Sequence, residues 1–171
     1  MGDDALVRHT KDPEIDEQVR SFGENMRAVR LSAGLSQVGL SQATRLDRAA
    51  ISFLERAERA PDLSTLVRVA RALAVKPADM LAGVGLCSPQ AFELPSGGER
   101  STEPGVRFGA NLRAARKGAG LSQEALAYEA EVDRAAISVY ERGGREPNLR
   151  TVLKLARALQ LNPVALFDGV E

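Results

Sequence analysis

The sequence predicts an all-α protein that contains two tandem copies of one small five-helix domain. The first observation is a repeat: Asp-Arg-Ala-Ala-Ile-Ser occurs at 47–52 and again at 133–138. Aligned at this offset without a gap, residues 22–84 and 108–170 are identical at 31 of 63 positions, which marks a duplicated domain. The second observation is that apolar residues recur every three or four positions, as in helices, and no segment shows the alternation of a strand.

The first helix of the first copy is predicted to be long, from about Pro13 to Ala33. Asp12-Pro13 is a helix start signal, with Asp as N-cap and Pro at the first helical position. An apolar stripe follows at helical spacing: Ile15, Val19, Phe22, Met26 and Val29. This stripe is longer than its own domain can cover, so we expect it to be buried against the linker, the other copy or a second chain. The second copy is expected to lack the extension, because Pro104-Gly105 comes just before Phe108.

The later helices are predicted from the same signals in both copies. Gly34 and Gly120 end the first helix in a left-handed conformation. The predicted N-caps are Ser36 and Ser122 for the second helix, Asp47 and Asp133 for the third, and Asp62 and Asn148 for the fourth. A fifth helix begins at Pro77 or Pro163 and ends at Gly83 or Gly169. These elements divide the chain into a mobile acidic leader (1–12), a first domain (13–84), a flexible linker (85–107) and a second domain (108–171).

Composition limits the classes of function. The net charge is zero, but the two 63-residue copies hold nine basic residues each against six and seven acidic ones, which leaves a nucleic-acid partner open. No apolar run approaches the roughly 20 residues needed to cross a bilayer, and the N-terminus lacks the features of a signal peptide. We therefore expect a cytoplasmic protein with no membrane partner.

The sequence offers little for catalysis. His9 is the only histidine, there is no cluster of metal-ligand residues, and no phosphate-binding glycine loop follows a strand. Cys87, the single cysteine, excludes an internal disulfide, and a plain linker residue is favoured over a redox role. We predict no catalytic residue, no cofactor, no metal and no enzymatic activity.

A short helix, a tight turn and a second capped helix form a helix-turn-helix pattern in each copy. The segments at 120–127 (Gly-Leu-Ser-Gln-Glu-Ala-Leu-Ala) and 132–138 (Val-Asp-Arg-Ala-Ala-Ile-Ser), with Glu141-Arg142-Gly143 and Pro147-Asn148-Leu149, closely resemble the Cro/C1-type (XRE, lambda-repressor-like) DNA-binding domain. The resemblance covers both copies and leaves only the leader and the linker outside. It implies two tandem lambda-repressor-like domains joined by a flexible linker.

The resemblance also implies that the third helix of each copy enters the major groove of double-stranded DNA. The implied base-contacting residues are Arg48, Ala49, Ser52 and Phe53, with Arg134, Ala135, Ser138 and Val139 in the second copy. The two arginines are the strongest candidates, because a guanidinium can bind guanine O6 and N7 together; the alternative is a solvated arginine on the first helical turn. Phe53 and Val139 have two interpretations: contact with a thymine methyl group, or partial burial in the core.

Other residues are implied to hold the domain on the DNA backbone or to hold the fold. The implied phosphate contacts are Gln37, Arg56 and Arg59, with Gln123, Arg142 and Arg145 in the second copy. Arg30 with Glu55, and Arg116 with Glu141, match a buried structural pair that joins the first helix to the third. The first copy departs from the pattern at Gly39 and at Ala57-Glu58, and both copies lack the usual glycine in the turn, where Arg45 and Glu131 stand. We therefore expect the first copy to be the weaker DNA reader.

These residues predict a sequence-specific DNA-binding transcriptional regulator, repressor-like in type. The alternative is an antitoxin-like or protein-interaction module, which the near-neutral charge and the acidic leader favour. Double-stranded DNA is the expected partner, and a homodimer is a second partner that the sequence allows. Because a flexible linker of 23 residues would span two half-sites one helical turn apart, one chain could hold two similar half-sites.

Overall fold

The structure is a computed structural model that describes residues 12–84 and 103–170. Within these ranges the secondary structure is helical apart from one isolated bridge, which confirms the predicted all-α class. No helix in these ranges is long and apolar enough to cross a membrane. They also contain no group of three or more His, Cys, Asp and Glu side chains placed to hold a metal ion. The expectations for residues 1–11 and 85–102, including His9 and Cys87, lie outside them.

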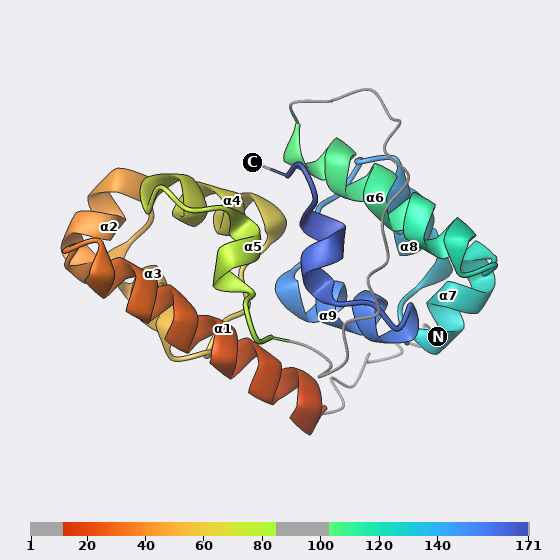
Figure 1. Ribbon diagram of the computed structural model, residues 1–171, viewed down its shortest axis with the longest axis horizontal. Helices are drawn as coiled ribbons and strands as arrows, with labels where there is room; N and C mark the ends of the chain where they lie inside the picture. Colours follow the sequence, from red (N-terminus) through yellow and green to blue (C-terminus); the bar gives the residue numbers. More distant parts are fainter. Residues whose placement is uncertain (1–11, 85–102, 171) are drawn as a thin grey trace, which may run out of the picture.

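The two copies have the same order of elements. The first contains α1 (Pro13–Ser32), α2 (Gln37–Thr44), α3 (Arg48–Glu55), α4 (Leu63–Ala72) and α5 (Pro77–Met80). The second contains α6 (Pro104–Gly118), α7 (Gln123–Glu129), α8 (Arg134–Glu141), α9 (Leu149–Ala158) and a 3-10 helix, η1 (Pro163–Phe167). Figure 1 shows the two sets side by side, with α1 to α5 on the left and α6 to α9 on the right. The fifth element is thus a single turn in one copy and a 3-10 helix in the other.

The helix starts follow the predicted caps with one exception. The side chains of Ser36, Asp62, Ser122 and Asn148 accept hydrogen bonds from the backbone N–H three residues further on, and Asp133 accepts from Ala135 and Ala136. Asp47 has the extended backbone of an N-cap, but its carboxylate makes no capping hydrogen bond. Because a capping bond stabilises a helix by about 1 kcal/mol, α8 is better anchored at its start than α3.

The second copy begins earlier than predicted. The linker was expected to extend to 107, but α6 starts at Pro104, so 104–107 are its first turn. Proline suits this position because its φ is already helical and the N–H it lacks would have no partner inside the helix. The Pro104-Gly105 pair is therefore a helix start, and the predicted end of the linker is wrong.

The first helix of each copy lies unusually close to the third because a glycine stands at the crossing. A Cβ atom added at Gly23 would lie 2.8 Å from the carbonyl oxygens of Leu54 and Glu55. Gly109 approaches the Tyr140 carbonyl in the same way. Only a residue without a Cβ permits this contact, so the two glycines help to fix α3 and α8 against their domains.

The apolar stripe of α1 is covered by the other copy. Ile15 and Val19 are fully buried, and α1 packs on α9. On the same part of the helix, Asp16 forms an ion pair with Arg150. The sequence left three partners open for this stripe: the linker, the other copy or a second chain. The structure places the other copy against α1.

Candidate nucleic-acid interface

The helix-turn-helix unit is held rigidly in the first copy. α2 packs on α3, and the Ser41 hydroxyl donates to the Leu46 carbonyl at 2.7 Å, which ties α2 to the turn. Arg45, which stands where the usual glycine is missing, has a left-handed backbone with a φ of 54°. Leu40 and Ile51 are fully buried beneath the unit. Because these side chains point inward, the opposite side of α3 is left facing solvent.

One shallow groove brings together six of the implied DNA-contacting residues of the first copy. It has a volume of about 290 Å³ and is lined by Gln37, Arg48, Ala49, Ser52, Phe53 and Arg56. Four of them were implied to contact bases and two to contact phosphates. Phe53 is 37% exposed, so its ring belongs to this surface rather than to the core. The third implied phosphate contact of this copy, Arg59, is exposed beyond the end of α3.

The second copy presents the same surface on α8. Arg134 and Ala135 are exposed on its first turn, and Ser138 and Val139 are half-buried one turn later. The implied phosphate-contacting residues Arg142 and Arg145 are exposed. Because α7 and α8 pack as α2 and α3 do, both copies present a short helix with an exposed arginine at its start.

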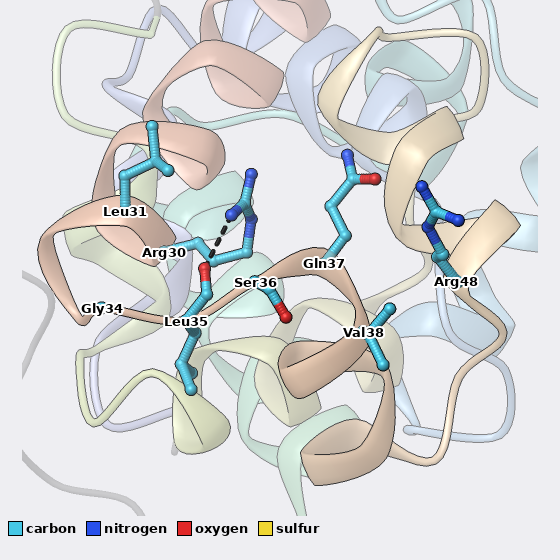
Figure 2. Close-up of a pocket in the computed structure, with 8 residues that line it drawn as sticks. All are labelled: Arg30, Leu31, Gly34, Leu35, Ser36, Gln37, Val38 and Arg48. Carbon is cyan, nitrogen blue, oxygen red and sulfur yellow. Dashed lines mark hydrogen bonds between the residues drawn. The ribbon is translucent and has the colours of Figure 1, made fainter.

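A buried network fixes the first three helices of each copy together. Arg30 Nε and Nη2 donate to the two carboxylate oxygens of Glu55 at 2.5 and 3.1 Å, and Arg30 Nη1 donates to the Leu35 carbonyl at 2.7 Å (Figure 2). Gln37 Nε2 donates to Glu55 Oε2 at 2.9 Å. This arrangement ties α1, the loop before α2, and α2 itself to the end of α3.

The second copy repeats this network with nearly the same geometry. Arg116 donates to Glu141 at 2.5 and 3.0 Å and to the Leu121 carbonyl at 2.8 Å. Gln123 donates to the same carboxylate at 2.8 Å. The sequence did not predict these amide bonds: Gln37 and Gln123 were implied to contact phosphate, yet their amide nitrogens are engaged inside the protein. The sequence did contain one signal for these hydrogen bonds, because the glutamine and the Arg-Glu pair recur together in both copies.

The carboxylates in these networks are charged in the folded protein. Burial raises the pKa of Glu55, but the hydrogen bonds from Arg30 and Gln37 outweigh it and hold the pKa below its ordinary value. Burial likewise raises the pKa of Glu141, and Arg116 and Gln123 reverse the effect. Each network is therefore an ion pair whose carboxylate accepts a third hydrogen bond from the glutamine.

The first copy has exposed apolar side chains beside the residues that are implied to contact DNA. A second groove, lined by Arg30, Leu31, Gly34, Leu35, Ser36, Gln37, Val38 and Arg48, adjoins the start of α2, and in Figure 2 the Gln37 and Arg48 side chains extend to the same side of it. Leu31 and Val38 are 58% and 47% exposed. The corresponding residues of the second copy are Lys117 and Glu124. Sequence reasoning missed this asymmetry, which the alignment of the copies could have revealed.

The two copies also differ at the end of the third helix. The guanidinium of Arg56 lies over the Phe53 ring, 5.6 Å from its centroid, and forms an ion pair with Glu58 at 2.9 Å. The corresponding residues near Arg142 are Val139 and Gly144, which offer neither a ring nor a carboxylate. The positive charge of Arg56 is therefore partly offset by Glu58, whereas Arg142 has a glycine at the corresponding position.

A family model and two known proteins match parts of this chain. A helix-turn-helix family model matches the chain twice, at residues 26–80 and 112–166. The control protein C.BamHI of Bacillus amyloliquefaciens is 39% identical over 62 residues, which are 36% of this chain and 76% of that protein. A crystal structure of the restriction-modification controller protein C.AhdI from Aeromonas hydrophila is 47% identical, with a TM-score of 0.36, over 36% of this chain and 94% of that one.

The two family matches together span more than half of the chain and include α2 and α3 in one copy and α7 and α8 in the other. They coincide with the residues on which the Cro/C1-type resemblance rests. The chain belongs to the helix-turn-helix family and is a DNA-binding transcriptional regulator of the Cro/C1 (XRE) type with two tandem copies of the domain.

Proposed function

We propose that this regulator reads a specific double-stranded DNA operator through the first turns of α3 and α8, and that residues 13–84 and 104–171 act as two reading units. The observation that carries the proposal is that Arg48 and Arg134 are exposed at the same position in both copies. Each stands on a helix that a buried Arg-Glu-Gln network holds in place. An exposed arginine on a helix that is held in place suits bidentate binding of guanine.

The neighbouring residues complete the proposed base-reading surfaces. Ala49 and Ala135 are small enough to bring the backbone close to a base edge, and Ser52 and Ser138 offer hydroxyl groups one turn later. Phe53 would contact a thymine methyl group, and the smaller, half-buried Val139 would reach less far. The two half-sites would therefore be similar and differ mainly at the base facing Phe53 or Val139.

Phosphate contacts would position each copy without reading sequence. Gln37 and Gln123 stand at the N-termini of α2 and α7, whose free backbone N–H groups attract an anion. Arg59, Arg142 and Arg145 are exposed past the third helices, and Arg56 contributes less because of Glu58. The second copy would accordingly bind the backbone more strongly than the first.

The test is a fluorescence anisotropy titration on a duplex selected from random sequences. Arg48→Ala and Arg134→Ala should each weaken binding by about 1–3 kcal/mol, and the double variant should bind at the non-specific level. Arg20→Ala is the matched control, because Arg20 is an exposed arginine of α1 paired with Glu17 on the same helix. Affinity should also fall steeply with salt concentration.

The results separate the two copies. If Arg134→Ala leaves binding intact, the second copy is not a reader. If Arg48→Ala alone is silent, only the second copy reads DNA. If no duplex is selected and a partner protein is captured instead, the antitoxin-like alternative replaces the proposal.

The printed names of two relatives support a narrower role, since one is a control protein and the other a restriction-modification controller protein. We propose control of restriction-modification genes, in a repressor-like manner, by a non-enzymatic cytoplasmic protein. Mapping the selected operator onto the source genome tests this role. An operator far from restriction and methyltransferase genes would contradict it and leave DNA reading unaffected.

A further inference from the structure

The contacts between the two copies come in pairs that exchange when the copies are exchanged. The 86-residue offset relates α1 to α6 and α4 to α9. α1 packs on α9, α4 packs on α6, and α5 packs on η1. The first two contacts are counterparts of each other, and the third is its own counterpart. A surface that contacts its own equivalent in this way is an isologous interface, which has two-fold symmetry.

The centre of the interface shows the same symmetry in single hydrogen bonds. The Leu63 N–H donates to the Pro147 carbonyl at 3.2 Å, and the Leu149 N–H donates to the Pro61 carbonyl at 2.8 Å. Leu63 and Leu149 are counterparts, as are Pro61 and Pro147. The antiparallel bridge between Asp62 and Asn148 that these bonds form therefore lies on a local two-fold axis.

We infer that the two copies form a closed pair with approximate two-fold symmetry, which presents α3 and α8 to an inverted repeat of two half-sites at one fixed spacing, so that one chain fills the operator. The inference rests on the proposed function. A two-fold axis reverses the direction of the second recognition helix on the duplex, whereas copies on a flexible linker would read direct and inverted repeats alike. The interface therefore replaces the flexible tether expected from the sequence.

Charges at the interface favour pairing of the first copy with the second. Arg150 pairs with Asp16, and Arg157 pairs with Asp12 at 2.7 Å and Glu14 at 3.5 Å. In the sequence, the counterparts of the three acids are Gly98, Arg100 and Thr102, and the counterpart of Arg150 is Ser64. A pair of two second copies would thus bring arginines together without these acids, and a pair of two first copies would lose the Arg150 contact.

A further asymmetric contact also favours pairing of the first copy with the second. Glu146 Oε2 accepts a hydrogen bond from the Ser64 N–H at 2.9 Å, and the counterpart of Glu146 is Ala60. Because the paired surfaces differ in charge and already cover each other within one chain, this chain should remain a monomer. The homodimer that the sequence allowed is the competing outcome.

The first experiment varies the arrangement of the selected half-sites. Duplexes carry them as an inverted repeat, as a direct repeat, and as an inverted repeat with five base pairs added, which turns one half-site to the opposite face. Wild-type affinity should be highest for the inverted repeat and fall by about 10²-fold or more on the other two, because only one copy can then engage. Sedimentation with the duplex should give one chain per operator.

The second experiment opens the interface while leaving α3 and α8 untouched. Arg150→Asp with Arg157→Asp, and separately Asp12→Arg with Asp16→Arg, place like charges together. Each double variant should lose most of its preference for the inverted repeat, and the combined four-residue exchange should restore it. Circular dichroism checks that each variant remains helical.

The outcomes are distinguishable from a failure of the proposed function. A protein that binds no duplex specifically overturns the proposed function. A protein that binds inverted and direct repeats equally, or that requires two chains per operator, overturns this inference while DNA reading stands. A concentration-dependent dimer of the free chain also overturns it.

Discussion

Glu55 and Glu141 are the residues on which the position of each recognition helix depends most directly. Each carboxylate is almost fully buried and receives hydrogen bonds from an arginine of the first helix and from the glutamine that begins the second. Isolated, such a charge would be costly to bury. The network therefore stabilises the fold only while all three groups are present, and it orients the third helix as a consequence.

Breaking the second network at one partner should be more damaging than replacing the pair. Arg116→Met leaves Glu141 buried without its cation and should reduce the free energy of unfolding by about 3–5 kcal/mol. The double variant Arg116→Met with Glu141→Leu should recover most of this loss, because two apolar side chains need no partner. Urea denaturation at pH 7 measures the free energy of unfolding of the single and the double variant. Equal decreases in the two variants would contradict the argument.

The same measurement has a defined pH dependence. Since the folded protein holds the pKa of Glu141 below its ordinary value of 4.5, the ion pair contributes its full stability above that pH. The contribution is lost as the pH falls below it, through the lowered pKa of the folded state. The double variant should accordingly lose less stability than the wild type between pH 5 and the acid limit of folding.

At the scale of the elements, the two copies differ in how their third helices end. α8 is followed by Gly143, with a φ of 69°, and α3 by Ala57, with a φ of 57°. An L-residue in this left-handed region costs about 1–2 kcal/mol. The chain therefore contains a relaxed and a strained version of the same exit, at corresponding positions.

Exchanging these two residues should move stability in opposite directions. Ala57→Gly should stabilise the protein by about 0.5–1 kcal/mol, which is the relieved strain less the extra freedom of glycine in the unfolded chain. Gly143→Ala should destabilise it by about 2 kcal/mol or more, because the new Cβ atom would also lie 2.8 Å from a Val106 side-chain carbon. Thermal unfolding tests the pair, and a stabilising Gly143→Ala would refute the strain argument.

Local signals were sufficient to predict most of the elements. The caps at Ser36 and Asp62 and the apolar spacing of each helix depend on neighbours within one turn, so they can be recognised in the sequence. The early start of α6 at Pro104 was missed because Pro-Gly also suits a linker. The missing capping bond of Asp47 depends on a side-chain rotamer, which no sequence pattern specifies.

Contacts between distant segments were predicted only where the family resemblance supplied them. The Arg30–Glu55 pair was expected in this way, whereas the hydrogen bond from Gln37 to Glu55 was not. The apolar stripe indicated that α1 needed a cover, but three covers were open. What decided among them is the fit of α1 on α9, with Asp16 against Arg150, and this fit involves residues 134 positions apart.

At the scale of the whole molecule, the interface should make the two copies unfold as one unit. Ile15 and Val19 of α1 are buried, α1 packs on α9, and α4 packs on α6 on the other side of the two-fold axis. Burial of each aliphatic side chain contributes about 1.5–3 kcal/mol. If this burial free energy is lost when one copy unfolds, the other copy is destabilised by the same amount. The unfolding transitions of the two copies are then coupled.

The chain provides a direct test of this coupling, because it has no tryptophan and its two tyrosines, Tyr128 and Tyr140, both lie in the second copy. Tyrosine fluorescence therefore reports the second copy alone, while far-ultraviolet circular dichroism reports the helices of both. In urea the two midpoints should coincide for the full chain. Deletion of residues 1–19 removes Ile15 and Val19 and should separate the midpoints, whereas deletion of residues 2–11 should leave them together. Midpoints that already differ in the full chain would mean that the copies unfold independently and that their spacing on DNA is not fixed by the interface.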